Sequence, residues 1–289
     1  MRILLIGRNG QIGWELQSTL APIGDVVALD RSQLDLTDLA AVASAIRQVA
    51  PQVIVNAAAY TDVDAAESQE ALARTINALA PATIAESARR LGALLIHYSS
   101  DYVFDGSITR SYREDDTVSP LSAYGRTKAE GEQLIAQCGG RHLILRTSWV
   151  YGSRGKNFLL TMLRLARECD RLAVVADQLG SPTWSRMIAL ATATLTKRVA
   201  GDDIRETVHV ASQGQASWHS FASAIIREGA SRGLCPATSV EPITTAEFPA
   251  PAPRPPQSVL STEWLHSRYG LQLGPWMPSL NRCLSDMVR

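Results

Sequence analysis

The chain has 289 residues, enough for one large domain or two modest ones with a sizeable core. Apolar residues make up 46% and charged residues 19%, which is typical of a soluble globular protein, and the formal net charge of zero argues against a nucleic-acid partner. The four cysteines form no Cys-x-x-Cys pair, so they predict reduced thiols in the cytoplasm rather than disulfides or a metal site. No apolar run approaches the roughly 20 residues of a membrane span.

The first half of the chain alternates apolar runs with helical patterns. The predicted strands cover residues 2–6, 25–29, 52–56, 93–99 and 142–147. The predicted helices cover 14–20, 37–49 with Thr37 as N-cap, 70–91, and a segment carrying Tyr124 and Lys128. This alternation predicts an α/β fold with a doubly wound parallel sheet, which binds ligands at the carboxyl ends of its strands.

A glycine-rich turn follows the first predicted strand and opens the first helix. Its three glycines are Gly7, Gly10 and Gly13. In such a turn the first glycine allows a tight bend, the second admits a pyrophosphate and the third lets helix and strand pack closely. The position between a strand and a helix predicts a dinucleotide site, which also includes the loop residues Asn9, Gln11 and Ile12.

Asp30 ends the second predicted strand, where a carboxylate commonly binds the adenosine ribose of NAD. Arg31 and Arg8 lie close by in sequence and could instead pair with the 2′-phosphate of NADP, so both NADH and NADPH stay open. The remaining residues expected at this cofactor are Asp35 and Leu36 over the adenine, and Ala59, Tyr60, Thr61 and Tyr98 along the cleft.

Tyr124 and Lys128 are four residues apart, so on a helix they share one face. A lysine ammonium near a tyrosine lowers the pKa of the phenol, which makes it a usable acid. Ser100, at the end of the fourth predicted strand, could hold the same substrate oxygen. This trio predicts a proton-transfer site next to a hydride donor.

The pattern is less regular in the second half, which we expect to form a smaller, discontinuous α/β substrate-binding lobe over residues 151–289. Residues 1–150 would form the nucleotide-binding domain, with later returns near 184–212 and an added strand at 207–211. Further predicted elements are a strand at 172–176 and helices at 158–169, 187–198, 217–232, 262–269 and 276–288. A proline-rich run at 248–256 cannot be helix or interior strand, and we expect it to wrap the lobe and present Arg254.

Several segments together resemble the extended short-chain dehydrogenase/reductases, and within them the dTDP-4-dehydrorhamnose reductases. The segments shared widely in the superfamily are 7–13, 55–59, 98–104 and 124–128. The resemblance also includes 146–152, 157–158, 177–183 and 254–255, of which 148–151 and 177–183 are the more specific ones. The resemblance implies NADPH- or NADH-dependent reduction of a dTDP-4-keto-6-deoxy sugar at C4, the last step of dTDP-L-rhamnose synthesis. It also implies that Tyr124 donates the proton, Lys128 binds the nicotinamide ribose, Ser100 tunes Tyr124, and Asp101 and Trp149 contact the sugar nucleotide.

One local difference separates activities within this superfamily. Sugar-nucleotide dehydratases carry Asp-Glu after the Ser or Thr, whereas this chain has Asp101 followed by Tyr102, which favours reduction. Two alternatives stay open: a redox-neutral epimerase, and a non-catalytic dinucleotide-binding subunit similar to the methionine adenosyltransferase beta subunit. Magnesium dependence occurs in the family, but Glu15 alone does not predict a metal site, and a homodimer is a further expectation. His97 is predicted to be an ordinary buried histidine.

Overall fold

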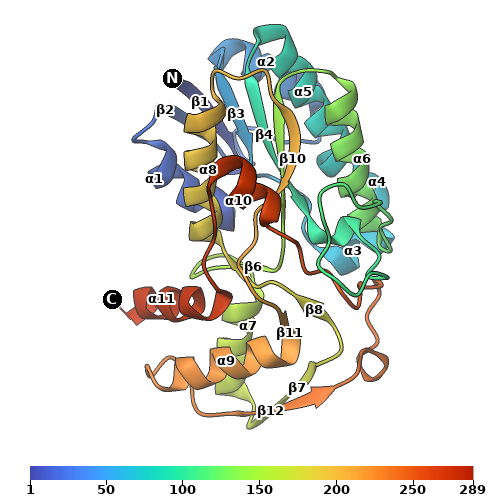
Figure 1. Cartoon of the computed structure of the whole chain (residues 1–289), viewed down its shortest axis with the longest axis vertical. Coiled ribbons are helices and arrows are strands. Elements are labelled where there is room, and N and C mark those ends of the chain that lie inside the picture. Colours follow the sequence, from blue (N-terminus) through green and yellow to red (C-terminus); the bar gives the residue numbers. More distant parts are fainter. Residues whose placement is uncertain (289) are drawn as a thin grey trace.

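The structure, a computed structural model, describes residues 1–288. Its centre is a six-stranded parallel sheet in the order β10-β5-β4-β3-β1-β2, which confirms the predicted fold class (Figure 1). The strands are β1 (Arg2–Ile6), β2 (Asp25–Leu29), β3 (Val53–Asn56), β4 (Leu94–Ser100), β5 (His142–Thr147) and β10 (Arg205–His209). The strand expected at 207–211 is therefore present as β10, the last member of the main sheet, where it pairs with β5.

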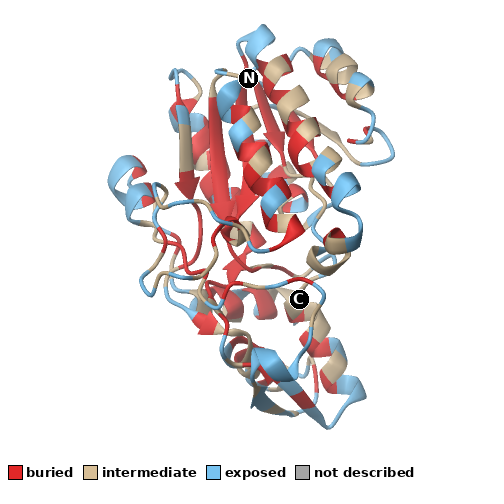
Figure 2. Cartoon of the chain, turned by 90° about the vertical axis from the view of Figure 1, so that its right-hand side faces the viewer, coloured by how far each residue is buried: buried red, intermediate tan, exposed pale blue. Residues whose placement is uncertain are grey.

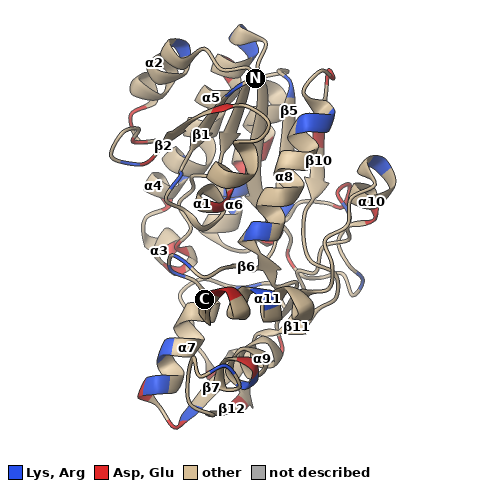
Figure 3. Cartoon of the chain, turned by 90° about the vertical axis from the view of Figure 1, so that its left-hand side faces the viewer, with Lys and Arg blue, Asp and Glu red and all other residues tan. Residues whose placement is uncertain are grey.

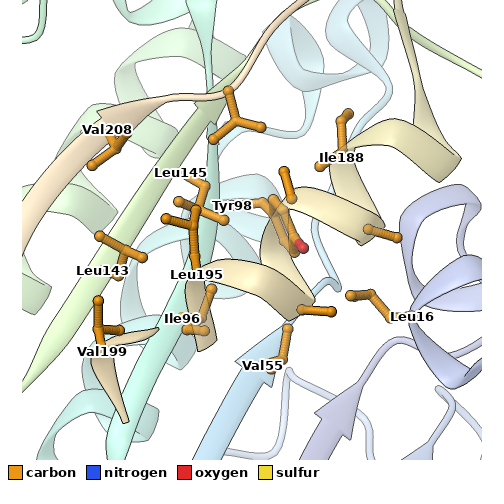
Figure 4. Packing of buried hydrophobic residues seen from close by; sticks show 14 of the residues in the cluster. Leu16, Val55, Ile96, Tyr98, Leu143, Leu145, Ile188, Leu195, Val199 and Val208 are labelled. Carbon is orange, nitrogen blue, oxygen red and sulfur yellow. The ribbon is translucent and has the colours of Figure 1, made fainter. Parts of the chain in front are cut away.

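Helices cover both faces of this sheet, because its strands are apolar on both sides. One face packs against α1 (Gln11–Leu20) and α8 (Ser185–Val199), and Figure 4 shows Leu16, Ile188 and Leu195 of these helices among the sheet residues. The other face packs against α2 (Leu39–Val49), α5 (Ala80–Leu91) and α6 (Ala123–Gln137). The main strands are accordingly buried along most of their length (Figure 2).

One local prediction on this side of the molecule was wrong. Asp38, not Thr37, caps α2, since its side chain accepts from the Ala41 amide while Asp35 binds the Thr37 hydroxyl and amide. The helix predicted over 70–91 is present with those bounds, but it contains a π-helical turn that was not predicted: α4 (Glu70–Arg74) runs through η1 (Thr75–Leu79) into α5, and the short helix α3 (Val63–Ser68) precedes it.

Asn77 accounts for the irregularity of η1. Its buried amide accepts from the Tyr60 amide at 2.8 Å and donates to the Tyr60 carbonyl at 3.0 Å, which fixes the loop after β3. Gly131 of α6 lies directly against this turn, because a Cβ there would be 2.2 Å from the Asn77 carbonyl oxygen. The π-helical turn thus positions α6, and with it Tyr124 and Lys128.

The second half of the chain builds a separate apolar cluster below the sheet (Figure 1). Its helices are α7 (Phe158–Glu168), α9 (Trp218–Ala230) and α11 (Trp276–Val288). The predicted strand is β7 (Arg171–Val175), and it pairs with β12 (Ser239–Ile243), which was not predicted because its sequence is polar and contains Pro242. Two short pairs complete this part, β6 (Val150–Tyr151) with β9 (Thr183–Trp184) and β8 (Leu179–Gly180) with β11 (Ala216–Ser217). We propose that the main sheet with its covering helices is the predicted nucleotide-binding domain, and that this second cluster is the predicted substrate-binding lobe.

Residues 249–257, which we call the strap, connect the two regions after η3 (Thr245–Glu247). The amide of Ala252 donates to Asp64 on α3, and Gln257 forms a bridge with Leu179 of β8. Gly106 packs so closely that a Cβ there would be 2.6 Å from Pro256. After the strap, α10 (Glu263–Tyr269) returns to the main sheet, where Leu265 belongs to the same apolar cluster as the sheet, α1 and α8 residues. Among residues 1–288 we find no helix with the length and hydropathy of a membrane span.

Candidate active site

A cleft of about 640 Å³ opens at the carboxyl ends of β1, β3 and β4. Most predicted cofactor residues line it: Gly7, Asn9, Gly10, Gln11, Ile12, Asp30, Leu36, Ala59, Tyr60, Thr61, Tyr98, Tyr124 and Lys128. Gly13 and Asp35 lie outside its lining, as do the predicted substrate residues Ser100, Asp101, Trp149 and Arg254.

The glycine-rich turn has the close backbone packing that its sequence predicts. Gly7 has a φ of +89°, and a Cβ there would lie 2.7 Å from the Ala58 amide nitrogen. A Cβ on Gly13 would lie 2.0 Å from the Gly7 carbonyl oxygen. Larger residues at Gly7 and Gly13 would push α1 and the loop after β3 away from the cleft.

The cleft offers unpaired polar groups to a ligand. Gly10 stands at the N-cap of α1 without a capping side chain, so the first-turn amides of that helix remain available for a phosphate. Three buried side-chain oxygens on the lining have no hydrogen-bond partner: Gln11 Oε1, Ser99 Oγ and Thr147 Oγ1. Buried polar atoms are normally paired, so these groups fit a bound dinucleotide.

The carboxylate of Asp30 is already engaged by the protein. It accepts from the Ser32 hydroxyl at 2.6 Å, from Arg8 Nη2 at 2.9 Å and from Asn9 Nδ2 at 3.2 Å. The Ser32 and Arg8 hydrogen bonds lower its pKa to about 2. Arg8 balances this negative charge, which weakens the repulsion that a 2′-phosphate would otherwise meet.

Ser100 and Tyr124 come together as predicted, Ser100 from the end of β4 and Tyr124 from the first turn of α6. Burial raises the pKa of Tyr124 to about 12, a hydrogen bond with Ser100 opposes this, and the negative charge of Asp101 adds to it. Tyr124 therefore keeps its proton at neutral pH and can act as a proton donor.

Lys128 lies one turn along α6, but its ammonium is directed into the sheet. Nζ donates to the Tyr98 carbonyl at 2.6 Å and lies 3.4 Å from His97 Nε2. Burial lowers the pKa of Lys128 to about 8. The Ser100 hydroxyl, not Lys128, is the group that lowers the Tyr124 pKa in this structure, which differs from the effect that the spacing predicts.

Asp101 follows Ser100 and is buried, with 2% of its surface exposed. Its carboxylate accepts from the hydroxyls of Ser258 at 2.6 Å, Ser148 at 2.9 Å and Ser100 at 3.1 Å. Burial raises its pKa to about 6 despite these three bonds. In this structure the Asp101 carboxylate binds these hydroxyls and orients Ser100; direct contact with a substrate stays a prediction.

Trp149 sits at the strand end after β5, as expected, in a left-handed backbone conformation with φ of 45°. Its ring stacks on Trp218 with centroids 3.4 Å apart and planes at 3°, and its other neighbour is Gly180. The indole nitrogen is buried without a partner. The sequence analysis did not identify Trp218, whose ring supports Trp149.

Arg254 reaches from the strap to the first region. Its guanidinium donates to Asp64 Oδ2 at 2.9 Å, and it also interacts with the hydroxyl of Tyr102. The Tyr102 ring stands edge-on to the Tyr124 ring, with centroids 6.1 Å apart. Arg254 and Tyr102 thus connect the strap to Tyr124, a contact of Tyr102 that the sequence did not indicate.

The surroundings of Glu15 do not suit magnesium. Its carboxylate binds Arg186 of α8 at 3.0 Å, and the same guanidinium pairs with Asp286 of α11. Figure 3 shows α1, α8 and α11 on one side of the molecule, with both basic and acidic residues along the chain there. No cluster of three His, Cys, Asp or Glu residues with metal-binding geometry occurs within residues 1–288. Arg186 already supplies the positive charge between the two carboxylates.

Other lining residues were missed by the sequence analysis. They include Arg31, which was considered only as a phosphate partner, and Asp62, Ile76, Ser99, Thr147, Val150, Gly155 and Lys156. Thr147 is the last residue of β5 and pairs with Ser100, the last residue of β4, while Ser99 directly precedes Ser100. A rule that looks for polar residues at strand ends could have found both. Gly155 and Lys156 belong to an irregular loop whose return to the cleft has no local sequence signal.

The chain is similar over its whole length to several known proteins. The dTDP-4-dehydrorhamnose reductase of Burkholderia thailandensis is 45% identical over 100% of this chain and 99% of its own. The crystal structure of such a reductase from Clostridium acetobutylicum superposes with a TM-score of 0.92 at 38% identity, covering 100% of both chains. That from Bacillus anthracis, in complex with NADP, gives 0.90 at 34% identity over 99% of both. The family model for the RmlD substrate binding domain matches residues 1–289, and the chain belongs to this family.

Proposed function

We propose that this chain is an NAD(P)H-dependent oxidoreductase that reduces the C4 ketone of dTDP-4-dehydrorhamnose to give dTDP-L-rhamnose. The observation that carries the proposal is the meeting of Ser100 and Tyr124 beside the glycine-turn cleft. The full-length relatives of 40–45% identity that are named as this reductase support the same assignment.

The proposed chemistry assigns each group a separate role. A nicotinamide coenzyme in the cleft supplies the hydride to C4. Tyr124, kept protonated by burial, donates its proton to the C4 oxygen as negative charge develops there. Ser100 lies beside Tyr124 and is proposed to hold the same oxygen: its single O–H, which donates to the Asp101 carboxylate in this structure, turns to the C4 oxygen when the substrate is bound. Lys128, buried one helical turn after Tyr124, is the second group that can release or take up a proton at this site.

The substrate is proposed to lie between the catalytic trio and the second region. Trp149 is held by stacking on Trp218 and by close contact with Gly180, so it offers a fixed aromatic surface to the sugar nucleotide. Arg254 is a guanidinium within the strap and suits the negative charge of a sugar nucleotide. Tyr102 stands where a dehydratase would carry a glutamate base, so reduction rather than elimination is favoured.

We propose that both coenzymes are used and that NADPH is accepted well. Arg8 compensates the charge of Asp30, and the side chain of Arg31, 80% exposed, is free to turn towards a 2′-phosphate. The Bacillus anthracis structure in complex with NADP supports this assignment. We further propose that the enzyme works in the cytoplasm.

A coupled assay tests the proposed function. Purified protein is mixed with dTDP-4-dehydrorhamnose and either NADPH or NADH, and coenzyme oxidation is followed together with the sugar product. The proposal expects oxidation only when the keto sugar is present, with dTDP-L-rhamnose as the product. Failure to turn over any 4-keto deoxysugar nucleotide would contradict it.

The same assay separates the two alternatives. A redox-neutral epimerase would change the sugar stereochemistry without net coenzyme consumption, and coenzyme would remain tightly bound through purification. A regulatory subunit would bind coenzyme, leave the sugar unchanged and form a stable complex with a synthetase.

A further inference from the structure

Behind Lys128 lies a buried row of polar side chains that the proposed mechanism does not use. Asn56 of β3 and His97 of β4 are paired neighbours in the sheet, and each is 1% exposed. Asn56 Nδ2 lies 3.1 Å from His97 Nδ1, and His97 Nε2 lies 3.4 Å from Lys128 Nζ. The imidazole therefore stands between the amide and the catalytic lysine.

The hydrogen bonds around Asn56 determine which nitrogen of His97 carries the proton. The Ala58 amide donates to Asn56 Oδ1 at 3.2 Å, which fixes the orientation of the side-chain amide. Its NH₂ group then faces His97, and because this group can only donate, Nδ1 must accept. Burial and the neighbouring Lys128 both lower the His97 pKa, so the ring is neutral. A neutral ring that accepts at Nδ1 carries its proton at Nε2.

This tautomer directs an N–H donor at Lys128. A neutral lysine amine has a lone pair that can accept from His97 and an N–H that can donate to the Tyr98 carbonyl. An ammonium has no lone pair, so it would face the His97 N–H with another donor. The contact thus favours the amine over the ammonium.

Few charged groups near Lys128 counteract the effect of the His97 N–H on its protonation. On α6 itself, Tyr124 precedes it by one turn and is protonated, and Glu132 follows it by one turn. Arg146 of β5 binds both carboxylate oxygens of Glu132, at 2.9 and 2.7 Å, and so balances its charge.

We propose that His97 is a positioning residue for the reductase, whose Nε2–H group shifts Lys128 towards its neutral form and eases release of the lysine proton. His97 keeps its own proton throughout, and only Lys128 exchanges one. The role in turnover rests on the proposed function, whereas the effect on Lys128 can be measured on the protein alone.

The protein has three lysines, Lys128, Lys156 and Lys197, which makes a direct measurement practical. Nuclear magnetic resonance of the full-length protein, labelled at the lysine ε-carbon and the histidine ring nitrogens, would follow each lysine from about pH 6 to about pH 11. In the wild type we expect an Nε2–H tautomer at His97 and a Lys128 pKa of about 8.

His97→Asn keeps a polar group near Asn56 but removes the donor to Lys128. The Lys128 titration should then move upward by about one pH unit, the amount that one hydrogen bond to the neutral form is worth. The alkaline limb of kcat/KM should move upward with it, because the ammonium persists to higher pH. His142→Asn, at a buried histidine near the start of β5, is the matched control and should leave the Lys128 titration unchanged.

A second variant keeps the proposal testable if His97→Asn does not fold. Asn56→Asp replaces the amide donor by an acceptor, so His97 should carry its proton at Nδ1 and the Lys128 titration should again move upward. An Nδ1–H tautomer in the wild type, or an unchanged Lys128 titration in His97→Asn, would overturn the proposal. If the resonance results are as expected but no keto sugar is reduced, the proposed function fails and the effect of His97 on Lys128 stands.

Discussion

The two regions of the molecule differ in how their residues are organised. The first is a regular parallel sheet with buried strands, and its polar groups gather at the strand ends beside the cleft. The second has short strands, a core rich in Trp and Phe, and a proline-rich strap that returns to the first. We infer that the first region fixes the chemistry and that the second selects the sugar. Changes in the first should therefore lower kcat, and changes in the second should raise KM.

Asp101 joins the two regions, since its carboxylate binds Ser148 at the end of the sheet and Ser258 after the strap. A single buried carboxylate thus binds both Ser100 and the chain that follows the strap. Single substitutions can therefore be chosen in the first region, in the second region or at Asp101 between them.

The largest expected effect comes from Tyr124→Phe, which removes the proton donor of the first region. We expect kcat to fall by about 10³-fold, as is usual when a general acid is lost, with little change in coenzyme affinity. Steady-state kinetics and a coenzyme titration by fluorescence measure the two quantities. A loss of coenzyme binding equal to the loss of kcat would contradict the assigned role.

Asp101→Asn tests the connection through its pH dependence. The folded-state pKa of about 6 lies above the unfolded value, so the folded protein binds more protons between about pH 4 and pH 6. The wild type should therefore lose up to about 3 kcal/mol of stability relative to Asp101→Asn as pH rises through that window. Urea unfolding of both proteins at about pH 4.5 and about pH 7 measures the difference. A difference that is independent of pH would show that Asp101 titrates normally.

Gly180→Ala tests the second region. The added Cβ would lie 2.3 Å from the Trp149 ring, so the indole must move off its place on Trp218. We expect a loss of about 1–3 kcal/mol of stability and a higher KM for the sugar nucleotide, with kcat less affected. Gly201→Ala, where nothing lies within 4 Å of the new Cβ, is the control. Equal effects on kcat and on coenzyme affinity would place Trp149 with the first region.

The smallest effect is expected for Arg31→Ala. Loss of one charged partner for the 2′-phosphate should reduce the preference for NADPH over NADH by about 10-fold, with NADH kinetics unchanged. Arg47→Ala on α2 is the matched control, because it removes an arginine outside the cleft lining. An equal loss with both coenzymes would show that Arg31 does not distinguish them.

Local spacing explains which parts of the site were predictable. Gly7, Gly10 and Gly13 lie within seven consecutive residues where β1 passes into α1, and Tyr124 and Lys128 lie one helical turn apart on α6. Because each group is close together in the sequence, its members can be predicted to be close together in space. The apolar runs of β4 and β5 also predict where these strands end, which places Ser100 at the end of β4 and Trp149 two residues after β5.

Contacts between distant segments were not predictable in the same way. Ser258 meets Asp101 across 157 residues, and Trp218 of α9 meets Trp149 in the segment after β5, so no local pattern encodes either pair. His97 looked like an ordinary buried histidine, because its strand shows only that it is covered and not that Lys128 faces it. The π-helical turn at Asn77 arises from hydrogen bonds to Tyr60, a tertiary effect that the alanine-rich sequence conceals.

Transfer of a labelled hydride tests the central claim most directly. The protein is supplied with NADPH carrying deuterium at the reactive C4 position of the nicotinamide, and the sugar product is analysed by mass spectrometry and proton resonance. Hydride delivery to the ketone predicts dTDP-L-rhamnose with one deuterium at sugar C4 and an equal amount of oxidised coenzyme. Unlabelled product, or an altered sugar without oxidised coenzyme, would contradict the account.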